Sequence, residues 1–326
     1  DVIFLDFAKA FDKVPHNRLV SKLKSHGIKG ETLNWIKSWL TDRYQRVKLG
    51  GVGSGWRRVT SGVPQGSVLG PILFLIFIND IDKQVMNSIL KFADDTKIFG
   101  GIQSVEDQRK LQNDLDNLLA WAQDWKMEFN VEKCKIMHIG KQNPNYTYSM
   151  GRTQLQVVKE EKDLGLWITS DLKVSRQCNQ AYCRANRMLG LINRTILNKS
   201  VYIMLRLYKS LVRPLVENCT VAWSPGYNKD KAVIEKIQRR FTKMIPAVKD
   251  MSYEERLRSL GLWSLEERRN RADLIQVYKM ATGHSAPRFD EFFCLSGDER
   301  TRGHSMKLSK NRSRLNLRQH FFSERV

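Results

Sequence analysis

Two adjacent aspartates, Asp94 and Asp95, interrupt an apolar stretch that reads KFADDTKIFG over residues 91–100. If each flank is a strand, the pair lies in a tight turn, where Asp is common. The 326-residue chain is rich enough in Asp that chance alone gives about one such pair. The pair is therefore consistent with an ordinary hairpin tip or with carboxylates that bind a metal, and a third carboxylate is needed to decide.

Asp6 is that third carboxylate. It follows Val2–Leu5, a continuous apolar run typical of a buried strand. If this strand lies beside the hairpin of residues 88–99, Asp6 and Asp94 meet at one sheet edge with Asp95 nearby. Carboxylates this close repel each other unless a cation neutralises them. Oxygen ligands without His or Cys favour Mg²⁺ or Mn²⁺ over zinc, and two such ions are the standard clamp for attack on a phosphate.

The surrounding pattern changes near residue 169 from mixed strands and helices to helices alone. Glycine-rich and proline-rich loops separate the elements of the first half, including SGVPQGSVLGP at residues 61–71. Two strands at 44–49 and 56–60 flank a glycine-rich turn, and 163–168 reads as one strand. The sequence predicts an α+β chain, with a small antiparallel sheet packed on helices, followed by an all-helical domain. The predicted domains are 1–168, 169–295 and a basic, flexible tail at 296–326.

The net charge of +21 is unevenly distributed. Residues 1–168 carry 24 Lys and Arg against 19 Asp and Glu, whereas residues 169–295 carry 23 against 12. A basic second half suggests a polyanion bound by the C-terminal part, although a merely solubilising surface is the alternative. The best candidates for contact with nucleic-acid phosphates are Arg239, Arg240, Arg268, Arg269 and Arg271.

Cysteine usage and hydropathy limit the kinds of site and the cellular location that this chain is expected to have. The chain has 5 Cys and 6 His without CxxC spacing, which argues against a zinc site and a disulfide scaffold and favours an intracellular protein. The longest apolar stretch, Val68–Ile78, contains Gly70 and Pro71 and is too short to span a bilayer, so no membrane partner is expected. We expect no secretory leader, because the first residues show no charged and apolar pattern of that kind. Because the chain opens on Asp1 within a strand, we expect it to be a fragment of a longer protein.

Five segments, in order, resemble the palm motifs of reverse transcriptases. They are FLDFAKAFDKV (4–14), SGVPQGSVLGP (61–71), FADDT (92–96), NVEKCKIM (130–137) and DLGLWI (163–168). The wording is most similar to non-LTR, LINE-like retrotransposons of the jockey type, and the helical half resembles their thumb and downstream region. The resemblance implies an RNA-directed DNA polymerase, with an RNA template, a DNA primer and dNTPs as partners and two Mg²⁺ ions, or Mn²⁺, as cofactors. It also implies a nuclear location.

The same resemblance implies roles at the metal site. Asp6 and Asp94 would be the main metal ligands, with Asp95 beside them and the backbone carbonyl of Phe7 in the shell. Lys133 would protonate the leaving pyrophosphate. Taken alone, Lys133 is as consistent with an ordinary surface lysine.

Further roles concern the nucleotide and the primer. Phe11 would be the steric gate that clashes with a ribonucleotide 2′-OH, and Gln65 with Gly66 would line the nucleotide pocket. Taken alone, Phe11 reads as a packed aromatic and Gln65 as a polar loop residue. The residues that would hold the primer 3′ end are Leu164, Gly165 and Leu166.

The chain departs from the family pattern at its start. Only five residues precede Asp6, so we expect the N-terminal fingers and the upstream endonuclease of a longer parent protein to be missing. Three hypotheses remain: a polymerase palm and thumb, a catalytically incompetent remnant that only binds nucleic acid, and another palm polymerase such as an intron maturase.

Overall fold

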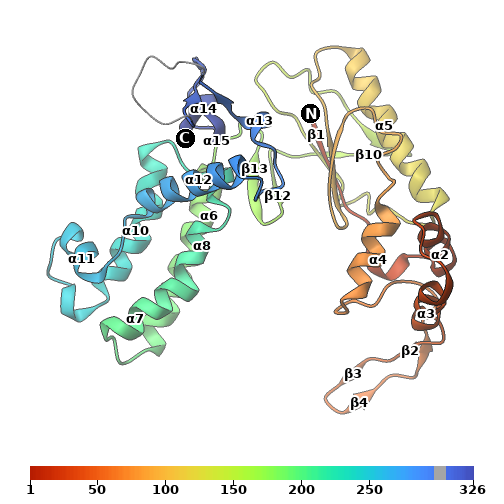
Figure 1. The fold of residues 1–326 in the computed structure, drawn as a ribbon, viewed down its shortest axis with the longest axis horizontal. Coiled ribbons are helices and arrows are strands. Elements are labelled where there is room, and N and C mark those ends of the chain that lie inside the picture. Colours follow the sequence, from red (N-terminus) through yellow and green to blue (C-terminus); the bar gives the residue numbers. More distant parts are fainter. Residues whose placement is uncertain (297–305) are drawn as a thin grey trace. The chain divides into compact units, whose positions relative to one another are not determined.

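The computed structural model describes residues 1–296 and 306–326, and the chain divides into two compact units, Asp1–Leu164 and Gly165–Val326 (Figure 1). The predicted α+β class is confirmed: the first unit mixes strands and helices, and the second is mainly helical. The finer division at residues 168 and 295 stays a prediction.

The first unit alternates short strands with amphipathic helices. Its helices are α1 (Ala10–Lys13), α2 (His16–Ser25), α3 (Gly30–Leu40), α4 (Leu69–Ile78) and α5 (Val105–Asp124). Its strands are β1 (Val2–Leu5), β2 (Tyr44–Gln45), β3 (Lys48–Leu49), β4 (Val52–Gly53), β5 (Arg57–Arg58), β6 (Ser88–Phe92), β7 (Asp95–Phe99), β8 (Lys135–Met137), β9 (Ser149–Met150), β10 (Thr153–Gln154), β11 (Gln156–Val157) and β12 (Glu160–Asp163).

A five-stranded sheet in the order β11-β8-β1-β7-β6 forms the centre of this unit, antiparallel except that β11 runs parallel to β8. Its register aligns isoleucines on four neighbouring strands, because Ile3 pairs with Ile136 on one side and with Ile98 on the other, and Ile98 pairs with Ile89. Three of these isoleucines, Ile3, Ile98 and Ile136, are fully buried. A one-residue slip would turn this row out of the core, so the row fixes the register.

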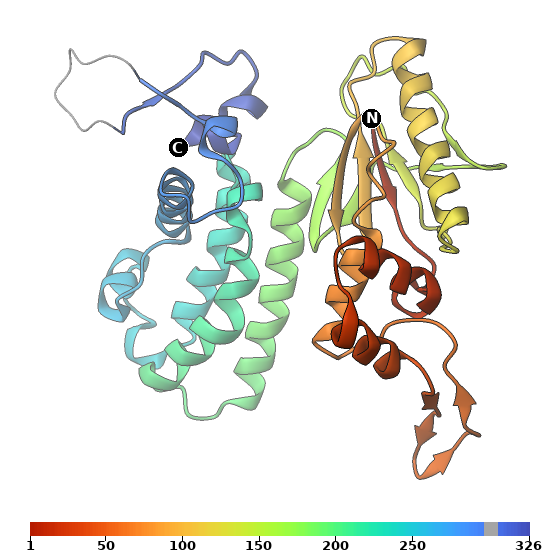
Figure 2. The ribbon, with the colours of Figure 1, turned by 45° about the vertical axis from the view of Figure 1, so that its right-hand side comes forward.

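Helices cover one face of the sheet. The buried residues Ile3, Leu5 and Ile98 share a core with the apolar faces of α2, α3, α4 and α5, and Figure 2 shows α5 alongside the strands. Alternate residues such as Phe4 and Lys97 point to the other face and are only partly buried. The sheet therefore has one packed face and one open face.

The second unit is a set of packed helices with little strand. Its elements are β13 (Leu166–Thr169), α6 (Ser175–Thr195), α7 (Val201–Leu207), the π-helical turn η1 (Tyr208–Val212), α8 (Arg213–Glu217), α9 (Thr220–Trp223), α10 (Asn228–Lys243), the 3₁₀ turn η2 (Pro246–Val248), α11 (Tyr253–Leu260), α12 (Leu265–Ala281), α13 (Phe289–Phe292), β14 (Cys294–Leu295), β15 (Leu308–Ser309), α14 (Asn316–Gln319) and α15 (Phe322–Arg325). The π turn ends at Val212, two residues before Pro214, whose missing N–H interrupts regular helical bonding.

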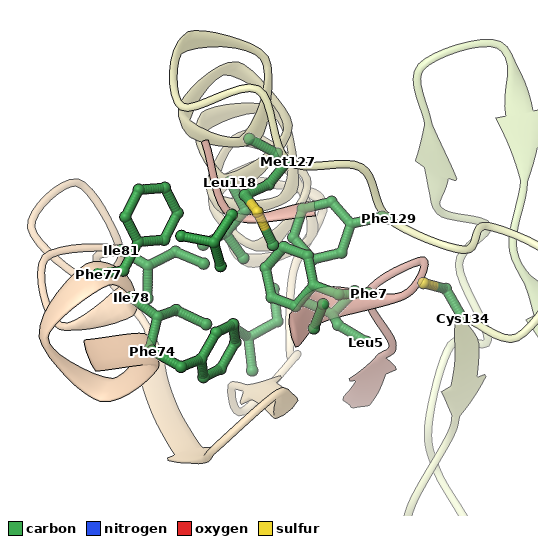
Figure 3. Packing of buried hydrophobic residues seen from close by; sticks show 14 of the residues in the cluster. Leu5, Phe7, Phe74, Phe77, Ile78, Ile81, Leu118, Met127, Phe129 and Cys134 are labelled. Carbon is green, nitrogen blue, oxygen red and sulfur yellow. The ribbon is translucent and has the colours of Figure 1, made fainter. Parts of the chain in front are cut away.

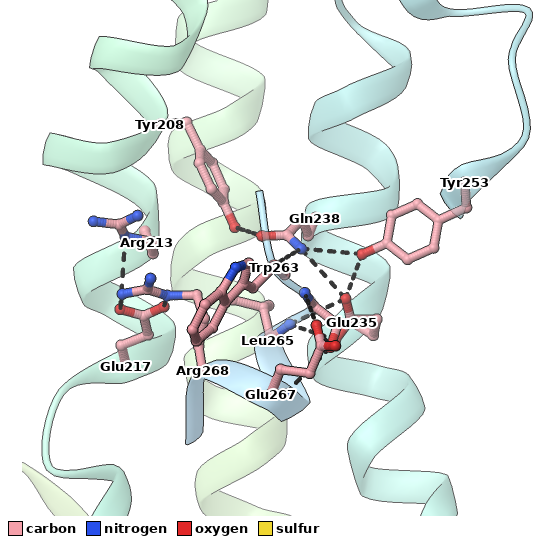
Figure 4. Close-up of polar contacts among 11 residues, drawn as sticks. Tyr208, Arg213, Glu217, Glu235, Gln238, Tyr253, Trp263, Leu265, Glu267 and Arg268 are labelled. Atoms are coloured by element: carbon pink, nitrogen blue, oxygen red, sulfur yellow. Dashed lines mark hydrogen bonds and ion pairs between the residues drawn. The ribbon is translucent and has the colours of Figure 1, made fainter. Parts of the chain in front are cut away.

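A buried polar network holds the helices of the second unit in place (Figure 4). Gln238, fully buried on α10, accepts a 2.7 Å hydrogen bond from the Tyr208 hydroxyl and donates to the Trp263 carbonyl and the Tyr253 hydroxyl. Glu235 accepts from the Tyr253 hydroxyl and from the N–H of Leu265. Burial raises the pKa of Tyr208 and Tyr253, so both hydroxyls stay protonated donors. A network with this many partners specifies one arrangement of helices.

The described end of the chain differs from the expected flexible tail. Residues 306–326 pack against the second unit, with Phe322 buried beside Met280 and Phe293. Arg325 forms a bidentate ion pair with Asp273 at 2.8 and 2.9 Å. The low apolar content of this segment did not predict its packing, because the packing depends mainly on the Phe322 ring and on the ion pair of Arg325. The rest of the predicted tail, residues 297–305, lies outside the described residues.

No helix in the described part of the chain has the length and apolar composition needed to cross a bilayer.

Lys22 is an unusual core residue of the first unit. Its side chain is 3 % exposed, and Nζ lies 3.7 Å from the ring centroid of Trp125 and 4.7 Å from those of Trp121 and Phe77. It also forms an ion pair with Asp80. Burial lowers the pKa of Lys22, and the aromatic faces and Asp80 compensate the buried charge. This lysine therefore ties α2 to α4 and α5.

We expect Lys22→Ala to destabilise the first unit by about 3 kcal/mol, because it removes three cation–π contacts and leaves Asp80 without its cation. Lys22→Met should cost about half as much, since its thioether still fills the space between the rings. Urea unfolding followed by tryptophan fluorescence measures both. A loss below about 1 kcal/mol for the alanine variant would show that the charge is not important for packing.

Candidate active site

The register of the sheet places Asp6 opposite Asp95. Strand β1 pairs Leu5 with Thr96, so the next pair outward is Asp6 with Asp95. Alternation along the strand puts Asp6 on the open face of the sheet. Asp94 directly precedes β7, in the turn that joins it to β6. The structure therefore brings the three predicted carboxylates together at one end of the sheet, with Asp95 rather than Asp94 directly across from Asp6.

The turn that carries Asp94 is strained. It contains two residues, Ala93 and Asp94, between the paired Phe92 and Asp95. Ala93 has a φ of 54°, at a position where hairpin turns usually have Gly. A left-handed conformation costs a residue with a Cβ about 1–2 kcal/mol, and such strain concentrates at functional sites.

Phe7 fixes the segment that follows Asp6 (Figure 3). Its ring is buried and stacks on Phe129 at a centroid distance of 4.3 Å. Backbone bonds from Asn130 to the Asp6 carbonyl and from Ala8 to the Glu128 carbonyl flank this pair. In this arrangement the N–H and C=O of Phe7 itself point away from the 128–130 segment. The Phe7 carbonyl is thus free of that pairing, as its predicted role requires.

Lys133 is the nearest cation to the site. Its Nζ lies 3.0 Å from Oδ2 of Asp6. The hydrogen bond and charge of Asp6, together with the charge of Asp94, raise the pKa of Lys133. Lys133 is therefore a protonated ammonium at neutral pH, although in this structure it neutralises Asp6.

Asp95 is under electrostatic strain. Partial burial, followed by the nearby charges of Asp94, Asp163 and Asp6, raises its pKa, and only Lys97 acts in the opposite direction. The carboxylates therefore form a concentration of negative charge that the neighbouring lysines only partly balance.

The donor chemistry of this cluster suits a hard divalent cation, because every ligand would be an oxygen and the charge is uncompensated. Nevertheless, no three His, Cys, Asp or Glu side chains among residues 1–296 and 306–326 are already arranged to hold a metal ion. The carboxylate of Asp6 would have to exchange its bond with Lys133 for the cation.

A cavity of about 420 Å³ opens on this face of the sheet. Two ion pairs connect β12 to the sheet across it, one from Lys97 to Asp163 and one of 2.8 Å from Lys135 to Glu161. Sequence reasoning missed these four residues. A signal was present, because Lys97 lies two residues after Asp95 and therefore on the same face. The cavity lining includes Asp6, Asp95, Lys133, Lys97, Lys135, Glu161, Asp163 and Leu164.

Phe11 is half-buried, and its ring stacks on Phe74 of α4 at a centroid distance of 4.6 Å. The amide of Gln65 donates a 3.2 Å hydrogen bond to Asp12, the residue that follows Phe11. The predicted nucleotide-binding residues therefore lie on the α1 segment and on the loop that packs against it. Their roles stay predictions.

Two glycines of that loop have different uses. Gly62 has a φ of 90°, and a Cβ there would come within 2.7 Å of the Asp12 carbonyl oxygen. It therefore allows close packing on α1. Gly66 has a φ of 81°, and no other atom lies within 4 Å of the point that a Cβ would occupy, so it is open beside Gln65.

The predicted primer-binding segment is a turn. Leu164 and Gly165 both have positive φ, 45° and 87°, so the expected single strand at 163–168 is replaced by β12 and β13. Paired positive φ values are typical of a type I′ turn. The mainly apolar sequence DLGLWI does not predict such a turn. Leu164 is half-exposed and lines the cavity, whereas Leu166 packs on the core of the second unit.

The expectation of phosphate contact is wrong for Arg269, whose side chain is only 2 % exposed. Arg268 is also engaged within the protein, in a two-pronged ion pair with Glu217 that includes a 2.9 Å bond (Figure 4). Adjacent arginines on a helix point about 100° apart, so one of them faced the core. A charge run read from sequence does not distinguish these two directions.

Arg239, Arg240 and Arg271 are exposed, as phosphate contact requires. Arg239 lies 4.0 Å from the ring centroid of Tyr253, and Arg271 lies 5.5 Å from that of Trp263. The first two line a second hollow of about 460 Å³, together with Lys243, Met244 and Arg256. Its charged lining is entirely cationic.

Comparison with known proteins gives the following similarities. The chain is 30 % identical over 230 residues to the RNA-directed DNA polymerase from the mobile element jockey of Drosophila melanogaster, which covers 65 % of this chain and 24 % of that protein. It is 32 % identical over 148 residues to the probable polymerase from transposon BS of the same species, covering 41 % and 16 %. Among solved structures, apo telomerase from Candida tropicalis matches with a TM-score of 0.41 and 14 % identity over 76 % of this chain and 42 % of that one.

The chain thus spans about a quarter of the length of the jockey polymerase. The family model for reverse transcriptase (RNA-dependent DNA polymerase) matches residues 2–177, which include Asp6, Asp94, Asp95 and the β12–β13 segment. The chain belongs to the reverse transcriptase family.

Proposed function

We propose that this chain forms the catalytic part of an RNA-directed DNA polymerase of a non-LTR retrotransposon, which adds dNTPs to a primer 3′-OH on an RNA template. The observation that carries the proposal is the β1–β7 register, which sets Asp6 and Asp95 at the next opposite positions, with Asp94 in the adjoining strained turn. All three carboxylates belong to the open face or edge of one sheet, so a substrate can reach them.

Divalent metals are general in this family, and Asp6, Asp94, Asp95 and the Phe7 carbonyl would hold two Mg²⁺ or Mn²⁺ ions here. Such ions activate the attacking 3′-oxygen and stabilise the leaving group. The chain's own contribution is to hold the carboxylates against their repulsion. Once Asp6 exchanges its partner, the ammonium of Lys133 is free to pair with the triphosphate and to protonate the pyrophosphate that leaves.

The remaining roles follow the surroundings of the cavity. Phe11 would exclude a 2′-OH, while Gln65 and Gly66 would contact the incoming nucleotide. The turn formed by Leu164 and Gly165, followed by Leu166, would hold the primer end. Strand β12 closes one side of the cavity through its ion pairs, which limits where a primer terminus can lie.

In the second unit, we propose that Arg239, Arg240 and Arg271 contact the phosphates of the template–primer duplex. Their exposure and the cationic hollow beside the first two support this role. Such contacts make affinity fall as salt rises. A nuclear location remains a prediction from the family resemblance.

Primer extension on an oligo(dT)-primed RNA tests the proposal. Asp94→Asn should reduce extension at least about 100-fold, because loss of one ligand from a two-ion site costs several kcal/mol of barrier at about 1.4 kcal/mol per factor of ten. Template affinity should change less than about twofold, since Asp94 repels phosphate and does not bind it.

Asp124 is an exposed residue of α5 outside the site, so Asp124→Asn makes the same chemical change there and is the matched control. Extension is measured on residues 1–326 and on any longer reading frame that contains them, and Mn²⁺ binding is followed by electron paramagnetic resonance. A loss below about tenfold in extension, together with unchanged Mn²⁺ binding, would exclude Asp94 as a ligand. Template binding without any extension in either form would instead indicate a nucleic-acid-binding module.

The raised pKa of Asp95 predicts a pH-dependent stability. Because the folded state makes Asp95 harder to ionise than the unfolded chain does, its charge costs stability above the raised pKa, and the cost disappears below the usual value of 3.8. In EDTA at pH 8, Asp95→Asn should therefore unfold at a higher temperature than the wild type, and the difference should shrink as the pH falls toward 4. A less stable Asn variant at pH 8 would contradict the repulsion.

Sugar selection tests Phe11. Phe11→Ala should raise the incorporation of ribonucleotides relative to dNTPs by about tenfold, because it removes the ring that would clash with a 2′-OH. The ratio of the two incorporation rates is the measurement, and retained dNTP incorporation shows that the variant folds. An unchanged ratio in an active variant would leave Phe11 as a packing residue on Phe74.

A further inference from the structure

A two-stranded ribbon, formed by β2 to β5 over residues 43–59, leaves the first unit without packing against its core (Figures 1 and 2). Its large side chains are open to solvent: Tyr44 is 60 % exposed, Trp56 62 % and Leu49 82 %. Exposed aromatic side chains that lie next to each other on neighbouring strands are candidates for a binding surface.

The register divides the ribbon into two unlike faces. Tyr44 pairs with Arg58, and Gln45 with Arg57, so Arg46 lies opposite Trp56. Beyond this point the pairing shifts by one residue, because Lys48 pairs with Gly53, which indicates a β-bulge near Trp56. One face therefore carries aromatic and basic side chains, namely Tyr44, Arg46, Lys48, Trp56 and Arg58. The opposite face carries the apolar Val47, Leu49 and Val52 and, nearer the first unit, the polar pair Gln45 and Arg57.

On the aromatic and basic face, rings and guanidinium groups alternate both along each strand and across the strand pair. Tyr44 has Arg58 across the strand pair and Arg46 two residues along, and Trp56 has the same two neighbours. The Arg46 guanidinium lies 4.6 Å from the Trp56 ring centroid. Arg58 also contacts Asp42 at 2.8 Å, but both are exposed, and a surface pair of this kind exchanges readily.

The positive charge of the ribbon favours a negatively charged polymer as its ligand. Residues 42–58 contain five Lys and Arg and a single Asp. Flat rings beside cations suit a ligand that offers both a phosphate backbone and unstacked bases, since stacking on aromatic side chains and phosphate contacts together bind single strands. A duplex keeps its bases stacked on each other and could use only the cations.

We propose that the ribbon face formed by Tyr44, Arg46, Trp56 and Arg58 binds single-stranded nucleic acid, with bases stacked on the two rings and phosphates paired with the two arginines. This surface is separate from the carboxylate site and does not depend on the polymerase activity proposed above.

The test measures binding of a fluorescent 20-nucleotide single-stranded RNA to the full chain by anisotropy, in EDTA so that metal at the carboxylates does not contribute. Trp56→Ala should weaken binding about tenfold, and Trp56→Phe should restore most of it, because a ring can still stack. Arg46→Ala should lower the slope of log affinity against log salt by about 0.7, the value for one phosphate of a single strand. A blunt duplex of the same length should lose less than threefold on Trp56→Ala.

Leu49→Ala, on the opposite face of the same ribbon, is the matched control and should bind as the wild type does. All of these positions are exposed, so the substitutions leave the core intact. Wild-type affinity in Trp56→Ala would overturn the proposal. So would an equal loss in Leu49→Ala, which would assign binding to the apolar face, or an equal loss for the duplex, which would exclude stacking.

Discussion

The β1–β7 register, which sets Asp6 opposite Asp95, is the constraint on which the first unit depends. Two carboxylates directly opposite each other repel, and Asp94 adds a third charge next to them. The opposing force is the buried row of isoleucines further along the same strands, because any slip of register that separated the carboxylates would also expose Ile3 and Ile98. Burial on the apolar face of the sheet thus offsets repulsion on the polar one. This explains why a strongly apolar strand ends on an aspartate.

Lysines balance part of this charge, and their positions limit what they can do. Lys133 is paired with Asp6, and Lys97 with Asp163. A lysine cannot neutralise a carboxylate and donate a proton to a leaving group at the same moment, so the two roles proposed for Lys133 are sequential. Asp163 has a double effect: it raises the pKa of Asp95 by its own charge and holds Lys97, the cation that lowers it. Strand β12 therefore influences the carboxylates without supplying a predicted ligand.

Sequence reasoning reached the parts of this structure that are encoded locally. The strand before Asp6, the hairpin around Asp94 and the main helices have clear periodicity or turn signals. Features that depend on which side of a helix or loop faces the core could not be predicted from the sequence. Arg269 is buried although it lies in a basic run, and Gly62 packs on the backbone of Asp12 although its loop looks like a substrate-binding one. Phe322 docks a segment whose composition suggested disorder. In each case one tertiary contact outweighs a local pattern.

The ribbon illustrates the opposite situation, in which the local pattern is complete and the tertiary contacts are absent from the described residues. An isolated two-stranded ribbon is marginally stable in water, so its own cross-strand pairs must hold it together. Those pairs are Tyr44 with Arg58 and Arg46 with Trp56, the same contacts that build its aromatic and basic face. A strand of nucleic acid bound there would contact both members of each pair and would restrict the ribbon's motion. The side chains that stabilise the ribbon are therefore the ones that a ligand would stabilise further, which couples its order to binding.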